Sequence, residues 1–260
     1  MIKAVFCDVD NTLTSSKTRT IPASALEAIQ KARKNGVKVF AATGRQTRTY
    51  EEGKILHGIP LDGYVAVNGQ LCYLPDDTII RKDVLDPRDI AVMLRMAKEL
   101  NFACCLVEGD QIYLTGIDEK VRKLHELVNI PYPVIRSAEG AESRDVLSIA
   151  LYIDIKTEAL ITPHLHHSEF VRFNPYNCDG IPRTGGKDVG MRAMLDYFGL
   201  STDQAMAIGD GHNDISILKA AGVGVTIGQC HPDVMAAADY HAPEADENGI
   251  WHTFEKFGII

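Results

Sequence analysis

The sequence AVFCDVDNT, residues 4–12, joins a short apolar run to a pair of acidic residues. An apolar run of this length is typical of a strand that is buried on both faces, as in parallel sheets. Ligands of open α/β sheets bind at the carboxyl ends of such strands. Asp8 and Asp10 follow the run directly, so the sequence predicts that both carboxylates lie at a binding edge.

Alternating strands and helices around this stretch predict an α/β fold with a parallel sheet. Four further apolar runs are predicted strands: residues 37–42, 64–67, 205–208 and 223–227. Ser24 and Glu27 fit a capping box at the start of the first helix, and Gly36 fits its end. Strands that alternate with helices favour an open sheet with helices on both faces.

The pattern changes between residues 83 and 182. Short strands there follow one another or are interleaved with helices, which indicates an α+β module with an antiparallel sheet. Asp86 is predicted to cap a helix that starts at Pro87. We therefore predict a main domain of residues 1–82 and 183–260, interrupted by a second domain at residues 83–182.

The composition limits the class of protein. The 260 residues are 45% hydrophobic and 24% charged, and the net charge is −8. This acidic balance gives no bulk attraction to nucleic acid or to an anionic membrane, so we expect neither as a partner. The six cysteines lack metal-site spacing, and no signal peptide or membrane span is recognisable, which favours a reduced, cytoplasmic protein. We expect a monomer, and the sequence leaves an oligomer open.

Three other motifs occupy positions comparable to that of Asp8. Thr43 follows a predicted strand, Lys187 starts a predicted helix, and the loop GDGHND contains Asp210 and Asp214. A hydroxyl and an ammonium group can bind a phosphoryl group, and carboxylate oxygens suit Mg²⁺. Taken alone, Thr43 is more often part of an ordinary turn and Lys187 a surface lysine, and the loop fits a capped turn equally well. Together they supply the positioning and charge neutralisation that phosphoryl transfer needs.

The acid pair itself suits a covalent reaction. One carboxylate can attack phosphorus to give an aspartyl phosphate, and the next carboxylate but one faces the same site. The second group can act as general acid and base if its pKa rises above about 3.9. Two acids that merely cap a loop are the alternative for an isolated motif.

The motifs as a set resemble those of the haloacid dehalogenase superfamily. In order they are Asp8-x-Asp10-x-Thr12, Thr43, Lys187 and Gly209-Asp210-x-x-Asn213-Asp214. The insertion is similar to the α+β cap of the Cof-type branch, subclass IIB, and the core motifs Thr43-Gly44-Arg45 and Asn68-Gly69 also resemble that branch. The resemblance implies a Rossmannoid catalytic core with a specificity cap. It also implies a small phosphorylated metabolite, often a sugar phosphate, as substrate of a Mg²⁺-dependent hydrolysis.

The resemblance implies roles for individual residues as well. Asp8 would be the nucleophile and Asp10 the general acid and base. The metal set would be the Asp8 carboxylate, the Asp10 backbone carbonyl, Asp210 and, through a water, Asp214. The phosphate would be bound by Thr43, Gly44, Lys187 and Asn213. Arg45 and Asn68, at neighbouring strand ends, are expected to contact the substrate.

Asn11 departs from this family's D-x-D-G-T pattern, which has glycine at that position. Asn tolerates a positive φ better than other non-glycine residues, so we expect the loop to keep its shape. Three alternative functions remain open: a phosphosugar mutase, a phospho-aspartate receiver and a phosphate-ligand binder without turnover. The loop GDGHND and the long insertion argue against a receiver.

The insertion adds weaker candidates. Polar residues on its predicted loops could contact a hydroxyl-rich leaving group, although most are expected to be solvated: Glu108, Asp110, Arg172, Tyr176 and Asp179. His164, His166 and His167 form an H-x-H-H cluster. Adjacent residues of a helix do not share a face, so the sequence favours a polar surface there over a metal site.

Overall fold

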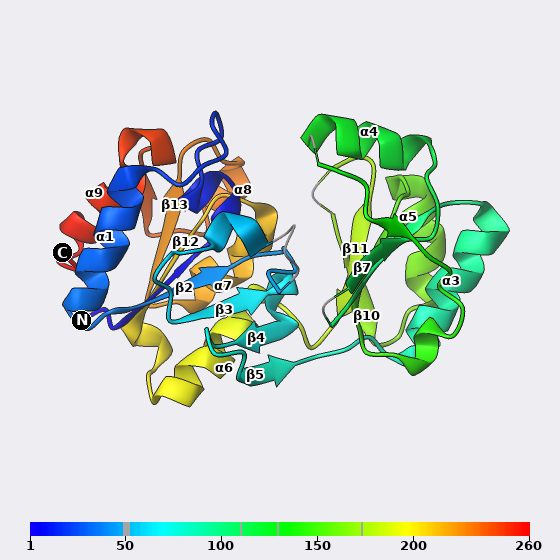
Figure 1. Ribbon diagram of the computed structural model, residues 1–260, viewed down its shortest axis with the longest axis horizontal. Helices are drawn as coiled ribbons and strands as arrows, with labels where there is room; N and C mark the ends of the chain where they lie inside the picture. Colours follow the sequence, from blue (N-terminus) through cyan, green and yellow to red (C-terminus); the bar gives the residue numbers. More distant parts are fainter. Residues whose placement is uncertain (49–52, 110, 129, 173) are drawn as a thin grey trace. The chain divides into compact units, whose positions relative to one another are not determined.

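The computed structural model describes residues 1–48, 53–109, 111–128, 130–172 and 174–260. The chain divides into two compact units (Figure 1). The first unit is Met1–Lys82 with Gly186–Ile260, and the second is Asp83–Gly185. Asp110, one of the candidate residues of the insertion, lies outside the described residues.

A mixed sheet forms the centre of the first unit. Among the described residues its strand order is β14-β13-β12-β1-β2-β3-β4-β5. Neighbours are parallel from β14 to β3, and β3, β4 and β5 pair antiparallel. The bounds are β1 (Ala4–Cys7), β2 (Lys38–Ala42), β3 (Gly63–Ala66), β4 (Leu71–Tyr73), β5 (Ile79–Lys82), β12 (Ala205–Gly209), β13 (Val223–Ile227) and β14 (Tyr240–Ala242). The expected parallel sheet is confirmed, and the antiparallel strands β4 and β5 are added at one edge.

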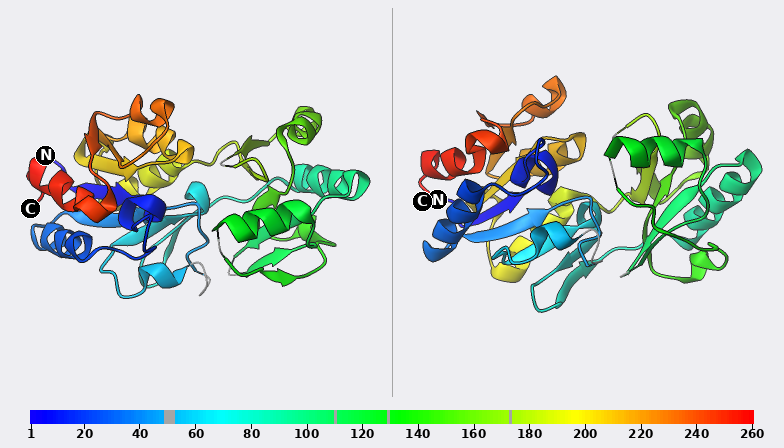
Figure 2. Two further views of the ribbon diagram at one scale, coloured as in Figure 1. Left: turned by 90° about the horizontal axis from the view of Figure 1, so that it is seen from above. Right: turned by 45° about the horizontal axis from the view of Figure 1, so that its top comes forward.

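Helices cover both faces of this sheet (Figure 2). They are α1 (Ala23–Lys34), α6 (Lys187–Phe198), α7 (Ile215–Ala220), α8 (Pro232–Met235) and α9 (Gly249–Lys256). Because successive side chains of a strand point to opposite faces, Val5 of β1 packs in one core with α1 and α9. Its neighbour Phe6 packs in the other core with α6 and α7 and stacks on Phe40 of β2, at 4.6 Å between ring centroids. Burial on both faces explains why β1 reads as an unbroken apolar run.

The start of α1 differs from the capping box that the sequence indicated. The helix begins at Ala23, directly after Pro22, and has no side-chain cap. The Pro22 carbonyl accepts the first hydrogen bonds, from the N–H groups of Ala25 and Leu26. Ser24 therefore lies inside the first turn and Glu27 in the second, where they cannot act as the two halves of a box.

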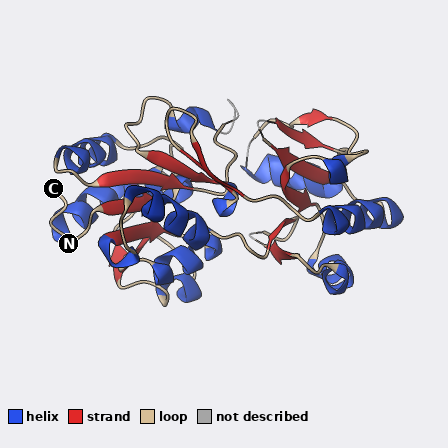
Figure 3. Cartoon of the chain, turned by 90° about the horizontal axis from the view of Figure 1, so that it is seen from below, coloured by secondary structure: helices blue, strands red, loops and turns tan. Residues whose placement is uncertain are grey.

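The second unit has its own sheet (Figure 3) and its own hydrophobic core. The strand order is β10-β11-β9-β6-β7-β8, antiparallel except for the parallel pair β7 and β8. Its elements are α3 (Pro87–Leu100), β6 (Cys104–Glu108), β7 (Gln111–Leu114), α4 (Glu119–Val128), β8 (Val134–Ile135), β9 (Val146–Leu151), α5 (Ile155–Ile161), β10 (Ser168–Val171) and β11 (Cys178–Pro182). Asp86 caps α3 as expected, since its Oδ1 accepts from the N–H of Arg88 at 2.9 Å.

Helices of the described ranges are too short or too polar to span a membrane.

Candidate active site

Polar side chains of four segments come together at the carboxyl edge of the parallel strands in the first unit. Asp8 follows β1, Thr43 follows β2 and Asp210 follows β12, and these three strands are adjacent. Lys187 is the first residue of α6. The side chains that the sequence singled out therefore meet because their strands are neighbours in the sheet.

Lys187 lies between two carboxylates. Its Nζ donates to Asp8 Oδ1 and to Asp214 Oδ1, both at 2.6 Å. The lysine side chain is fully buried, and those of Asp8 and Asp214 are 9% and 2% exposed. A buried ammonium group is tolerated only when it is paired, so these two contacts account for a lysine at the centre of the site.

Burial and neighbouring charges shift the ionisation of this cluster. Burial raises the pKa of Asp8 well above its usual range; Lys187 opposes this shift, and Asp214 and Asp210 add to it. Burial alone would lower the pKa of Lys187, but Asp214 and Asp8 raise it above its usual range. Burial raises the pKa of Asp210 to about 6, although the hydroxyl of Thr12 lowers it. Three carboxyl groups, of Asp8, Asp210 and Asp214, thus gather around one lysine.

Asp214 is held by the turn that precedes it. Its Oδ2 accepts from the backbone N–H groups of Gly211 and Asp210, at 3.0 and 3.2 Å. A Cβ at Gly209 would collide with the Asp214 carboxyl group, so the close approach requires glycine. The other oxygen, Oδ1, is thereby directed to Lys187.

Asp210 is oriented from the opposite loop. Thr12 Oγ1 donates to its Oδ1 at 2.9 Å, and the side-chain amide of Asn11 lies 3.5 Å from its Oδ2. Asn11 has φ 58°, so the loop keeps the expected conformation. The motifs in the sequence did not predict a contact of Asn11 or Thr12 with Asp210. Their position directly after the acid pair was the available signal, because it placed them on the loop that faces β12.

Three acidic residues could hold a metal ion. One carboxylate oxygen from each of Asp8, Asp210 and Asp214 lies within 4.8 Å of the others. Hard oxygen donors suit a divalent cation such as Mg²⁺. With Lys187 as the only cation bonded to this group among the described residues, a divalent ion would balance the three carboxylates. The donor set and the charge therefore fit the expected metal.

Thr43, Asn68 and Asn213 line the neighbouring part of the edge. Thr43 Oγ1 accepts from the N–H of Arg45 at 3.1 Å, which leaves its own hydrogen to donate. Asn213 donates through Nδ2 to Asn68 Oδ1 at 3.0 Å. A Cβ at Gly44 would lie 3.3 Å from the Asn68 amide, so Gly44 lets these groups pack closely.

Asp10 has a different partner from Asp8. Its two carboxylate oxygens accept from Arg45, with 2.8 Å from Nε to Oδ2 and 2.7 Å from Nη2 to Oδ1. The Asp10 side chain is 51% exposed and that of Arg45 is 29% exposed. Both residues were predicted from the sequence to lie at the site, but their ion pair with each other was not predicted.

Two candidates of the insertion support the fold of their own unit. Glu108 Oε1 accepts from the hydroxyl of Tyr113 at 2.6 Å and from Nε of Arg144 at 3.0 Å. Arg172 donates to Glu158 at 2.7 Å and also to three backbone carbonyls. Both residues are tied to their neighbours instead of being solvated, contrary to the general expectation for this group.

Comparison with known proteins gives a family for nearly all of the chain. The family model for haloacid dehalogenase-like hydrolases matches residues 5–254. YkrA of Bacillus subtilis is 24% identical, over 99% of this chain and 98% of YkrA. The phosphatase YitU of the same bacterium, which acts on 5-amino-6-(5-phospho-D-ribitylamino)uracil, is 26% identical over 96% of this chain and 95% of YitU.

Solved structures agree with this match. The phosphatase BT1666 from Bacteroides thetaiotaomicron superposes with a TM-score of 0.92, at 31% identity, over 100% of this chain and 96% of BT1666. BT4131, a sugar phosphatase of subclass IIB, superposes with a TM-score of 0.90, at 32% identity, over 99% of this chain and 100% of BT4131.

Proposed function

We propose that this chain, a phosphatase that belongs to the haloacid dehalogenase-like hydrolases, hydrolyses sugar phosphates with Mg²⁺ and Asp8 as its nucleophile. The observation that carries the proposal is the pairing of Lys187 with both Asp8 and Asp214, at 2.6 Å each, beside Asp210. Phosphoryl transfer needs a positioned nucleophile inside a charge-neutralising cradle, and these groups have that chemistry.

In the proposed reaction Asp8 attacks the phosphorus atom of the substrate. The bond from phosphorus to the leaving oxygen breaks, and Asp10 gives that oxygen a proton. Asp10 then takes a proton from the water that hydrolyses the aspartyl phosphate. Both oxygens of Asp10 contact Arg45 in this structure, so this ion pair opens before Asp10 carries a proton.

Lys187 keeps Asp8 oriented and offsets negative charge in both steps. Thr43 offers its hydroxyl hydrogen, and Gly44 and Asn213 belong to the same edge. Mg²⁺, held by Asp8, Asp210, Asp214 and the backbone carbonyl of Asp10, would supply a Lewis acid that offsets charge on the phosphoryl group.

The substrate class rests on the relatives. BT4131 is a sugar phosphatase, and YitU acts on a ribityl phosphate. Both leaving groups carry several hydroxyls, which suits polar partners such as Arg45 and Asn68. We assign substrate selection to the unit inserted after residue 82. We also assign the protein to the cytoplasm, in keeping with cysteines that are present as thiols, and we expect it to be a monomer.

A substrate panel tests the proposal. Purified protein with Mg²⁺ is expected to release inorganic phosphate from one or more sugar phosphates, and Asp8→Asn is expected to abolish release. Asp196→Asn, at an exposed position of α6, serves as the matched control and should behave as wild type. Phosphate release that survives Asp8→Asn would contradict the mechanism, and transfer to a second sugar hydroxyl would indicate a mutase instead.

A further inference from the structure

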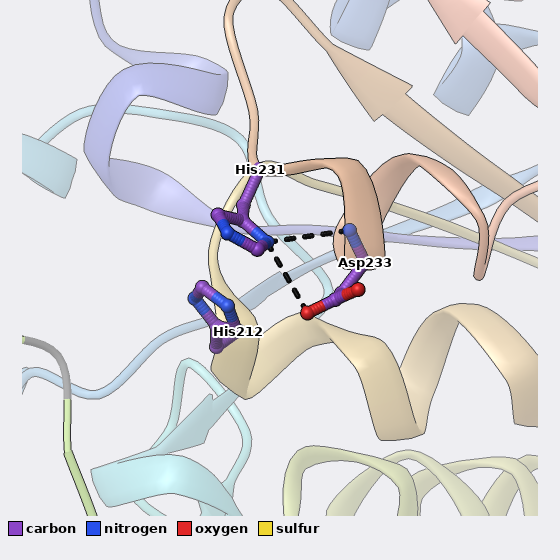
Figure 4. Close-up of side chains that lie close together, drawn as sticks. All are labelled: His212, His231 and Asp233. Atoms are coloured by element: carbon purple, nitrogen blue, oxygen red, sulfur yellow. Dashed lines mark hydrogen bonds and ion pairs between the residues drawn. The ribbon is translucent and has the colours of Figure 1, made fainter.

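Two histidines and an aspartate gather on the surface of the first unit, beside the loop of Asp210. His212 belongs to that loop, whereas His231 and Asp233 belong to the segment that starts α8. Figure 4 shows the two imidazole rings and the carboxylate close together. One donor atom of each residue lies within 4.8 Å of the others. The proposed phosphatase reaction uses none of the three.

We propose that His212, His231 and Asp233 form a second metal site, for a transition-metal ion such as Zn²⁺. Imidazole nitrogen is a favoured ligand of Zn²⁺, Ni²⁺ and Cu²⁺, whereas Mg²⁺ prefers oxygen. Two histidines and a carboxylate leave a fourth position for water, as in open zinc sites. This site therefore differs in chemistry from the all-carboxylate cluster around Asp8.

One ligand pair already has a suitable spacing. With tetrahedral bonds of about 2.0–2.2 Å, donor atoms around zinc lie roughly 3.3–3.5 Å apart. Nδ1 of His231 lies 3.3 Å from Oδ2 of Asp233. A single ion can thus bridge these two atoms without movement of the backbone.

The contact between His231 and Asp233 also favours a cation between them. The backbone N–H of Asp233 donates to Nδ1 of His231, at 3.3 Å, so this nitrogen presents a lone pair. A lone pair beside a carboxylate oxygen is repelled unless a proton or a metal ion separates them. The amide hydrogen bond is long, so its exchange for a metal bond costs little.

His212 can complete the set by a change of rotamer. Its ring centroid lies 4.8 Å from that of His231, and the ring planes are inclined by 44°. All three residues are exposed, with 55% and 73% for the side chains of His231 and Asp233. They can therefore close on an ion without repacking the core.

Zinc titration of tag-free protein in excess Mg²⁺ tests this site, because Mg²⁺ then occupies the carboxylate cluster. Calorimetry with Zn²⁺ gives the stoichiometry, and the absorption of bound Co²⁺ reports nitrogen ligands. His231→Ser removes one imidazole and keeps a side-chain oxygen that can cap α8. His164→Ser is the matched control, since it removes an exposed histidine from the other unit.

Wild type and His164→Ser are expected to bind one Zn²⁺ with equal affinity. His231→Ser is expected to bind at least about tenfold more weakly and to lose the Co²⁺ spectrum. Equal affinity of wild type and His231→Ser would overturn the proposal, as would the absence of Zn²⁺ binding in wild type. Asp210→Asn should keep the site; if it alone abolished binding, the ion would belong to the carboxylate cluster and the proposal would fail. These outcomes do not depend on phosphatase activity.

Discussion

Arg45 donates two hydrogen bonds to the carboxylate of Asp10, with 2.8 Å from Nε to Oδ2 and 2.7 Å from Nη2 to Oδ1. Such forked contacts fix the orientation of a carboxylate more firmly than a single bond does. The pair is partly exposed, however, and exposed ion pairs contribute at most about 1 kcal/mol. The pairing therefore orders Asp10 without locking it.

We predict from this pair that Arg45→Ala acts chiefly on substrate binding. Loss of a guanidinium group at the proposed phosphate-binding edge should raise KM about tenfold. Opening of a weak ion pair limits the rate little, so kcat should change by less than about fivefold. Steady-state kinetics with one sugar phosphate separates the two constants. A large fall in kcat at constant KM would instead mean that Arg45 acts through Asp10.

Asp10→Asn should affect substrates according to their leaving groups. An alkoxide leaving group needs a proton in the transition state, and loss of a general acid typically costs about 100- to 10,000-fold in kcat. An aryl phosphate with an acidic phenol needs much less help. We expect phosphate release from a sugar phosphate to fall at least about tenfold more than release from p-nitrophenyl phosphate. Equal losses on both substrates would argue that Asp10 only supports the loop.

Lys187→Met should destabilise the first unit. The change leaves the carboxylates of Asp8 and Asp214 buried without their shared cation, and breaking a buried pair in this way costs about 3–5 kcal/mol. Denaturant unfolding in chelator measures the loss. Since a divalent cation can replace part of the missing charge, Mg²⁺ should raise the Tm of Lys187→Met more than that of wild type.

The double variant Lys187→Met with Asp214→Asn is the control for this effect. It removes one of the two unpaired carboxylates, so it should regain part of the stability lost in the single variant. A double variant less stable than Lys187→Met would show that the hydrogen bonds of Asp214 to Asp210 and Gly211, and not its unpaired charge, dominate.

Asp179 predicts a pH dependence in the second unit. Burial raises its pKa from 3.8 to about 6, so the folded protein keeps a proton that the unfolded chain has lost between these values. The unfolded state binds fewer protons there, and this group lowers stability as pH rises from about 4 to 6. Asp179→Asn should therefore be the more stable protein at pH 7.5, by about 1–2 kcal/mol after allowance for partial exposure, and nearly equal at pH 4. Urea unfolding at both pH values, with Asp196→Asn as control, checks the sign; a larger gain at pH 4 would contradict it.

The sequence predicts the carboxyl edge well because the relevant residues follow buried strands. Asp8, Thr43 and Asp210 each come directly after an apolar run, and parallel strands bring such positions together. The conformation of the loop at Asn11 is equally predictable, because it depends only on the tolerance of Asn for a positive φ. These are local signals that need no knowledge of distant side chains.

Other features depend on distant side chains or on competition within a turn. The pairing of Arg45 with Asp10 depends on rotamers that the sequence does not specify. His212 and His231 lie on two loops that are distant in the sequence, and no sequence motif links them. The start of α1 illustrates competition within a turn. Ser24 fits an N-cap in the sequence, but Pro22, two residues earlier, is the N-cap in the structure. Propensity rules alone do not decide between two adjacent helix starts.

The insertion leaves the first unit after β5 and returns directly before Lys187. Asp8, Lys187, Asp210 and Asp214 all lie outside residues 83–185, so the carboxylate cluster and the inserted unit are built from separate segments of the chain. Exchange of the insert, or its substitution residue by residue, removes none of the contacts among Asp8, Lys187 and Asp214. A chimaera that carries the insert of a relative between Lys82 and Gly186 is expected to show the substrate preference of that relative, while the proposed catalytic residues stay unchanged.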